Sequence, residues 1–132
     1  MPSFPIIQFG TSRFLQAHAD LFVSEALTRG QALGRIVVVQ TTGSVESRKR
    51  LSAFAAGAPY FVHIKGIARG AIVDEEVEVR SIGGGADAND EWSEVERLFS
   101  EARCMISNTG DRGYEVDPGE ERGPGTPRSF PA

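Results

Sequence analysis

The residues best placed to do chemistry lie in one turn near the start of the chain, Gly10-Thr11-Ser12-Arg13-Phe14. A short apolar run ends at the glycine, and a helical pattern begins just after it. At such a junction the unpaired N–H groups of the helix and the positive end of its dipole face one point, where strand–helix–strand folds hold a pyrophosphate. The position of this turn therefore predicts a dinucleotide-binding site.

The glycine pattern of this turn is incomplete. Against the G-x-G-x-x-G fingerprint of dinucleotide-binding folds, Gly10 matches, but Ser12 and Leu15 stand at the second and third glycine positions. A side chain at Ser12 has to point away from a bound pyrophosphate. By pattern alone, the turn fits a cofactor site and a simple tight connection between strand and helix equally well.

A second candidate contact lies where the next apolar run ends, at Gln40 and Thr41. An acidic side chain at this place would accept hydrogen bonds from the ribose hydroxyls of NAD and repel the 2′-phosphate of NADP. The sequence has no acid at this exit, and Arg48, Lys49 and Arg50 follow shortly after it. This basic cluster could bind a 2′-phosphate or form a solvated helix face, so the choice between the two cofactors stays open.

A third candidate contact follows the last apolar run, at Asn108 and Thr109. If residues 104–107 form a parallel strand, both side chains lie at its carboxyl end, the edge where open α/β sheets bind ligands. There they could contact the ribose of a bound dinucleotide. The competing interpretation is a turn that the Asn108 side chain closes.

Alternating strand and helix patterns are predicted to position these three candidate contacts. Apolar runs at residues 4–9 and 35–40 show no polar alternation, which is typical of parallel strands covered on both faces. Between them we expect one helix that ends at Gly30. The buried stripe of this helix is expected to contain Leu15, Ala19, Phe22 and Ala26, widened by Phe14 and Leu21.

A helix and a hairpin are predicted next. Residues 45–56 have the pattern of a helix that ends before Gly57 and Pro59. Two β-rich runs, at residues 60–65 and 71–80, indicate antiparallel strands around a turn. Such a hairpin would be an insertion into the parallel sheet or an edge on it.

The last elements follow a glycine run. Gly83-Gly84-Gly85 indicates a flexible joint before a helix capped by Asn89 or Asp90. That helix leads into a strand at residues 104–107 in which Cys104 is expected to be buried. The buried side of the helix is expected to consist of Trp92, Val95, Leu98, Phe99 and Ala102.

These patterns together predict an α/β, Rossmann-like fold with a mostly parallel sheet, an antiparallel β-hairpin insertion and an incomplete set of strands. A partial dinucleotide-binding domain is expected to span residues 1–114. From residue 115 onward, prolines and glycines remove every periodic apolar pattern. Residues 115–132 are therefore expected to form a loop or a severed connection.

Composition excludes several classes of protein. The chain has 132 residues with 14 Lys and Arg against 18 Asp and Glu, so it lacks the basic excess of a general nucleic-acid binder. No apolar stretch is long enough for a transmembrane helix. Two distant histidines and the single Cys104 give no zinc spacing, so no metal site is expected. One cysteine and the lack of a leader pattern favour a cytoplasmic setting.

Four stretches of the chain resemble the mannitol dehydrogenase family, which comprises polyol-specific long-chain dehydrogenases and hexuronate reductases such as tagaturonate and fructuronate reductase. The stretches are QFGTSRFLQAH at residues 8–18, VVVQTTG at 37–43, ISNTGDRGY at 106–114 and RSFPA at 128–132. The resemblance implies an N-terminal Rossmann domain that binds a nicotinamide dinucleotide, NAD in most members, with NADP not excluded. It implies cofactor contacts from Gly10, Thr11, Ser12, Arg13, Phe14, Gln40, Thr41, Asn108 and Thr109.

The same resemblance implies that the catalytic group lies elsewhere. Family members use a Lys as general acid, with Asn and His beside it on a helical C-terminal domain. Here the lysines are Lys49 and Lys65, and neither lies in a matching motif. We therefore expect the cofactor-binding part of an NAD(P)-dependent oxidoreductase for a sugar acid or polyol, completed by a C-terminal domain or a complementary chain. The alternative is a non-catalytic nucleotide-binding or interaction module, which Ser12 and the missing acid favour.

Overall fold

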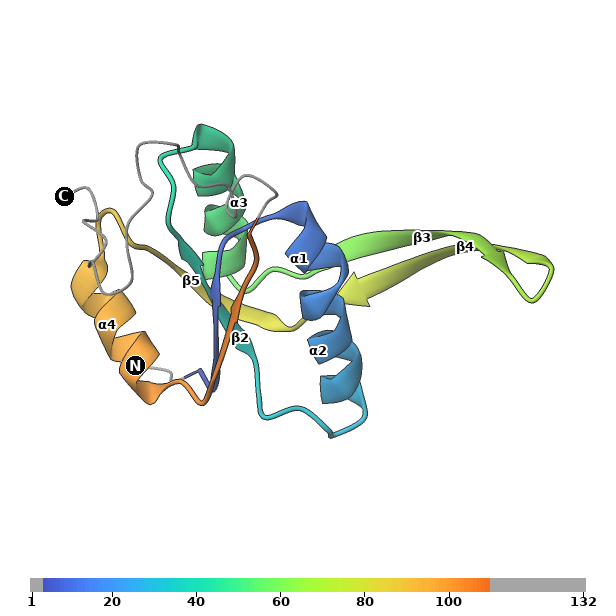
Figure 1. The fold of residues 1–132 in the computed structure, drawn as a ribbon, viewed down its shortest axis with the longest axis horizontal. Helices are drawn as coiled ribbons and strands as arrows, with labels where there is room; N and C mark the ends of the chain where they lie inside the picture. The colour runs from blue at the N-terminus through green and yellow to red at the C-terminus, as the bar shows by residue number, and fades with distance from the viewer. Residues whose placement is uncertain (1–3, 110–132) are drawn as a thin grey trace, which may run out of the picture.

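A computed structural model describes residues 4–109 and contains two β-sheets in that range (Figure 1). The larger sheet is parallel, with the strand order β5-β2-β1-β6. The predicted α/β, Rossmann-like fold is confirmed, and within residues 4–109 its parallel sheet has four strands. The strands of this sheet are β1 (Ile6–Phe9), β2 (Ile36–Gln40), β5 (Ile82–Asp87) and β6 (Cys104–Ser107). The helices are α1 (Arg13–Ala17), α2 (Ala19–Thr28), α3 (Val45–Ala55) and α4 (Trp92–Glu101).

The core lies on the two faces of β2, all five residues of which are buried. On one face Val37 packs in a cluster with Leu98 of α4, and on the other face Val38 packs in a cluster with Phe54 of α3. A continuous apolar run with β-branched side chains is what a strand covered on both faces requires. The expectation of a parallel strand covered on both faces is thus confirmed.

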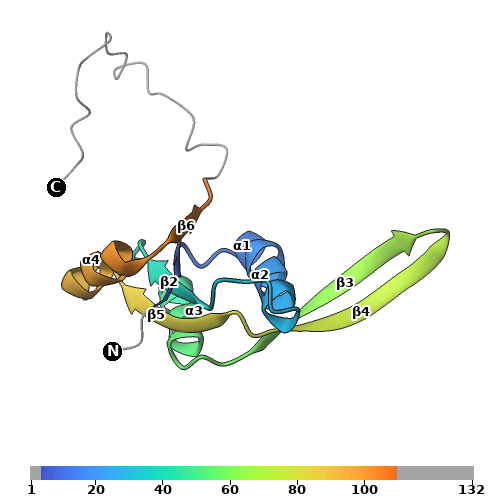
Figure 2. The same ribbon diagram turned by 90° about the horizontal axis from the view of Figure 1, so that it is seen from below.

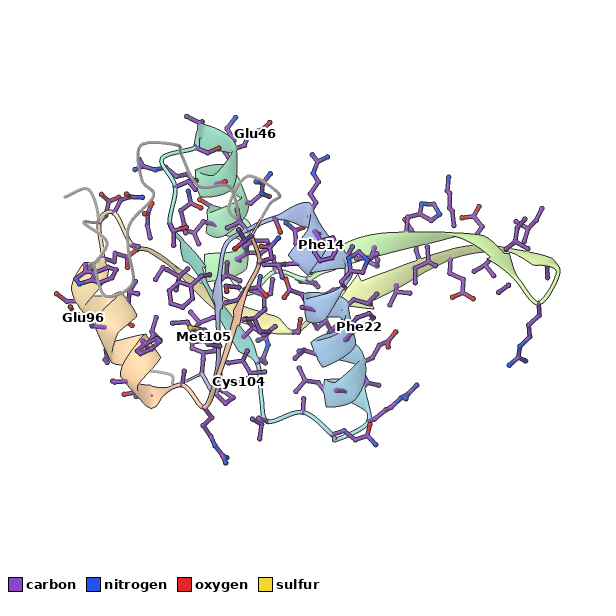
Figure 3. All side chains as sticks on the ribbon, viewed as in Figure 1. Phe14, Phe22, Glu46, Glu96, Cys104 and Met105 are labelled. Carbon is purple, nitrogen blue, oxygen red and sulfur yellow. The ribbon has the colours of Figure 1, made fainter. Side chains whose placement is uncertain are left out.

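The single helix expected between the first two strands is divided in two. His18 adopts φ −123° and ψ −85°, outside the helical region, so α1 ends before it and α2 begins after it. The His18 ring donates a hydrogen bond from Nδ1 to the Phe14 carbonyl oxygen at 2.7 Å. Because the break changes which face of α2 points inward, the expected buried stripe is wrong in part. Phe14 and Phe22 are exposed (Figure 3). In contrast, Asp20, Leu21 and Ser24 are buried.

The predicted hairpin is confirmed. Strands β3 (Tyr60–Ala68) and β4 (Ala71–Val79) pair antiparallel and form the smaller sheet. Arg69 and Gly70 make the turn, both with positive φ. Figures 1 and 2 show that the hairpin extends outward from the parallel sheet as a two-stranded arm.

The glycine run that was expected to be a flexible joint is instead part of β5, a strand that pairs with β2. A Cβ at Gly83 or Gly84 would lie within 3.0 Å of the Phe4 ring, and a Cβ at Gly85 would lie 2.8 Å from Leu51 Cδ1. Glycine is therefore required at these positions, because neighbouring side chains occupy the space that a larger residue would need. Glycine has a low propensity for β-strands, but here the tertiary packing favours a strand in spite of it.

Three further expectations for the last elements are wrong. Helix α4 has Glu91 at its N-cap position with no side-chain cap, because Asn89 is used elsewhere and Asp90 lies one position too early. Its inner face is narrower than expected, since Trp92 and Phe99 are more than half exposed. Cys104 is exposed as well, because β6 is an edge strand with exposed residues at most of its positions (Figure 3).

Some features of the sequence fall outside the described residues. The proline- and glycine-rich segment 115–132, the expected domain boundary at residue 114, and the motif residues from Gly110 onward are among them. Within residues 4–109, no helix is both long and apolar enough to cross a membrane.

The packing of β5 predicts that Gly85 tolerates no side chain. We expect Gly85→Val to lower the free energy of unfolding by about 1–3 kcal/mol, because the new side chain overlaps Leu51 and the Ala55 backbone. Gly66→Val is the matched control, since a Cβ at Gly66 in the exposed strand β3 meets nothing within 4 Å. Urea unfolding followed by Trp92 fluorescence measures both, and equal effects of the two substitutions would contradict this account.

Candidate functional site

The candidate site lies where the strand order of the parallel sheet reverses. From β1 the chain moves to β2 and then to β5, and it afterwards crosses back to place β6 on the other side of β1. The first connections pack α2 and α3 on one face, and the return connection packs α4 on the other. The chain therefore diverges between the carboxyl ends of β1 and β6, which is the position where open α/β sheets bind ligands.

Gly10 and Asn108 lie side by side at this point. The Gly10 N–H donates to the Val39 carbonyl oxygen at 2.9 Å, which ties the turn to the end of β2. A Cβ built on Gly10 would lie 3.9 Å from Asn108 Oδ1. Two of the residues predicted from separate stretches of sequence are thus brought together just beyond the carboxyl ends of β1 and β6.

The rest of the turn is organised by side-chain hydrogen bonds. Ser12 is the N-cap of α1, and its Oγ accepts a hydrogen bond from the Leu15 N–H at 3.2 Å. The Gln16 side-chain amide donates to the Thr11 carbonyl oxygen at 3.0 Å. Thr11 is buried, while Arg13 is exposed. The Ser12 hydroxyl therefore caps the first turn of α1.

The exit of β2 is held by Gln40, which is fully buried. Its side-chain amide donates to the Thr42 carbonyl oxygen at 2.6 Å and to the Thr42 hydroxyl at 3.0 Å. Gln40 thus shapes the turn instead of facing solvent, whereas Thr41 next to it is exposed. Thr109 is exposed beyond β6. A contact of Gln40, Thr41 or Thr109 with cofactor stays a prediction.

An acid that sequence reasoning missed lies beside this exit. Asp87 ends β5 and is the register partner of Gln40. Its Oδ1 accepts hydrogen bonds from the backbone N–H and the side-chain amide of Asn89, both at 2.9 Å, and its Oδ2 lies 3.5 Å from Arg48 Nε. The hydrogen bonds from Asn89, with the charge of Arg48, lower the pKa of Asp87. Asp87 could have been found from sequence only if Gly83-Gly84-Gly85 had been recognised as a strand.

A buried polar pair lies beneath the turn. The Gln8 side-chain amide donates to the Gly10 carbonyl oxygen at 3.3 Å and to Asp20 Oδ2 at 3.2 Å. Asp20 is fully buried, and desolvation raises its pKa to about 6, although the hydrogen bond from Gln8 opposes the shift. Tyr60 donates from its hydroxyl to the Gln16 carbonyl oxygen at 2.7 Å, and burial together with the charge of Asp20 raises its pKa.

The backbone at Gly10 predicts a strict requirement for glycine. Its φ is +109°, a conformation that L side chains rarely adopt, although a Cβ there would make only ordinary van der Waals contacts. We expect Gly10→Ala to lower the free energy of unfolding by about 1–3 kcal/mol. Gly43→Ala, in an open turn without positive φ, should change it by no more than about 0.5 kcal/mol. Urea titration of both variants tests this, and an unchanged Gly10→Ala variant would argue against the turn geometry.

The buried carboxyl group of Asp20 predicts a pH-dependent stability. Its folded pKa of about 6 exceeds the ordinary 3.8, so the stability linked to its proton is complete below about pH 4 and is lost as pH rises through 6. Above that pH, ionised Asp20 costs about 3 kcal/mol. Asp20→Asn, which never ionises, should be more stable than the wild type at pH 7.5, with the difference shrinking toward pH 4.

The control for this prediction is Glu25→Gln, which removes an exposed acid from the same helix. Urea unfolding between pH 4 and 7.5 measures the three proteins. Wild-type and Asp20→Asn curves that stay parallel across this range would show that the Asp20 pKa is not raised.

The chain matches no protein-family model. Over 110 residues it is 26% identical to an altronate oxidoreductase of Halalkalibacterium halodurans, a match that covers 82% of this chain and 21% of that protein. Its fold is similar to a mannitol 2-dehydrogenase of Pseudomonas fluorescens, with a TM-score of 0.67 and 21% identity, and to a D-sorbitol dehydrogenase, with a TM-score of 0.69 and 21% identity.

The chain spans only a part of each of these proteins. The two structural matches cover 89% and 88% of this chain but 24% of each solved chain. About three quarters of each solved dehydrogenase therefore has no counterpart in the matched region. The resemblance of the sequence to the mannitol dehydrogenase family is confirmed by these relatives, and the chain has a Rossmann-like fold that is similar to part of each of the two solved dehydrogenases.

Proposed function

We propose that the chain is the dinucleotide-binding part of an oxidoreductase that acts on a sugar acid or a polyol, with NAD as its cofactor. The observation that carries this proposal is the meeting of Gly10 and Asn108 at the point where the strand order reverses. The names of the relatives support the substrate class, and the mannitol 2-dehydrogenase structure is a ternary complex with NAD and D-mannitol.

The residues of the turn fit a pyrophosphate group. A phosphate can approach the Gly10 backbone closely because this residue has no Cβ. Ser12 satisfies the Leu15 N–H, while the N–H groups of Arg13 and Phe14 have no carbonyl of a preceding helical turn to bond and can donate to an anion. Arg13, an exposed residue of this turn, adds a positive charge.

When bound, NAD would accept or donate a hydride at its nicotinamide ring. We propose that Asn108, which follows β6 and lies close to Gly10, would hold the nicotinamide ribose. The proton that must accompany the hydride needs a general acid or base. Lys49 lies on α3 and Lys65 lies on the hairpin arm. Neither of these elements starts or finishes at the candidate site between the ends of β1 and β6. The proposal therefore assigns proton transfer to the part of the relatives that this chain does not match.

Direct titration tests the proposal. Calorimetry of the purified chain with NADH should show saturable binding, and Asn108→Ala should bind NADH several-fold more weakly because it loses a hydrogen-bonding group at the ribose. Gln31→Ala, an exposed change in the connection before the amino end of β2, is the control that should leave binding unchanged.

The possible outcomes separate the site from the function. Binding that is insensitive to Asn108→Ala would place the cofactor elsewhere on the molecule. No binding at millimolar NADH or NADPH would reject the proposal and favour a non-catalytic interaction module.

A further inference from the structure

The exit of β2 carries a charged pair that the sequence pattern does not reveal. Asp87 and Arg48 come from different elements, the end of β5 and the first turns of α3, and they meet beside Gln40. Asp87 has only 9% of its side chain exposed, whereas half of the Arg48 side chain is exposed. The pair thus consists of a buried, fixed carboxylate and an accessible guanidinium.

The carboxylate is held rigidly in place. Asn89 donates two hydrogen bonds to Asp87 Oδ1, and the same Asn89 amide donates to the Thr42 carbonyl oxygen at 3.0 Å. The exit of β5 is therefore tied to the turn that leaves β2, and Asp87 Oδ2 is left facing Arg48. Because Asn89 and Arg48 lower its pKa, Asp87 is ionised at neutral pH.

The location gives this pair a chemical role that rests on the proposed function. All four parallel strands end at the same edge of the sheet, so a dinucleotide held at Gly10 extends its adenosine half toward the end of β2. Adjacent strands lie about 4.8 Å apart, so Asp87 is only one strand beyond that exit. A 2′-phosphate bound there would accordingly meet the side chain of Arg48. The negative charge of Asp87 is already paired with that side chain.

We propose that Asp87 sets the preference of the chain for NAD over NADP by holding and neutralising Arg48. The acid absent from the end of β2 is supplied by the neighbouring strand. Asp87 acts through Arg48 and through its own negative charge, so it is a positioning residue for cofactor choice. A free Arg48 would bind a 2′-phosphate by charge-assisted hydrogen bonds, whereas the paired Arg48 has its nearest donor turned to Asp87.

The test compares NADH and NADPH binding by calorimetry to the wild type, Asp87→Asn, Asp87→Asn/Arg48→Gln and a control. Asparagine keeps the size of Asp87 and its acceptor for Asn89 while removing the charge. Asp87→Asn should raise the affinity for NADPH about tenfold with little change for NADH. Adding Arg48→Gln should abolish that gain. The control Asp90→Asn removes an exposed charge three residues away and should leave the NADH-to-NADPH ratio unchanged.

Each outcome bears on the proposal differently. A change of the ratio in Asp87→Asn that Arg48→Gln reverses supports it, and a merely structural role of Asp87 would weaken both ligands together. If the chain binds NADH and Asp87→Asn does not alter the ratio of its NADH and NADPH affinities, this inference is overturned. The proposed function is then left intact. A wild-type chain that binds neither dinucleotide overturns both.

Discussion

The position of β1 between β2 and β6 is the constraint on which the rest of the molecule depends. All four residues of β1 pair with both neighbours, so the strand cannot shift in register without losing hydrogen bonds on two sides. The carboxyl ends of the three strands are thereby aligned. Gly10 leaves β1 and Asn108 leaves β6 at that aligned edge, and the geometry of the candidate site follows directly from the pairing.

Polar groups below the turn are part of the same arrangement. Gln8 points from β1 into the layer of α2, where it connects the Gly10 carbonyl oxygen to Asp20. Gln8 Oε1 and Asp20 Oδ1 have no hydrogen-bond partner among the described residues, so this pair is costly to bury when Asp20 is ionised. A β1 strand with only apolar side chains would not need this polar pair. The unfavourable burial of ionised Asp20 occurs where Gln8 holds the β1–α1 turn. The pH dependence of stability is thereby linked to the candidate site.

Several parts of the fold follow from local sequence, while others do not. The runs at β1 and β2 are long enough and apolar enough to predict covered parallel strands, and the turn at Arg69-Gly70 separates two clear β-patterns. The break between α1 and α2 at His18 is not marked by a glycine or a proline in the sequence. The strand character of Gly83-Gly84-Gly85 cannot be seen locally either, because it arises from the packing of Phe4 and Leu51 against them. Exposure of Trp92, Phe99 and Cys104 likewise depends on where the sheet ends.

By itself, the sequence determined the first two parallel strands, the β3–β4 hairpin, the glycine turn after the first strand and the resemblance to a family of dehydrogenases. These features are local, or they recur as short motifs, so neighbouring residues are enough to reveal them. Only the tertiary structure decided that Asp87 stands next to Gln40 and faces Arg48. The physical reason is strand pairing. Parallel neighbours are joined by long connections, and the side chains that meet at their ends are distant in the chain and leave no pattern in it.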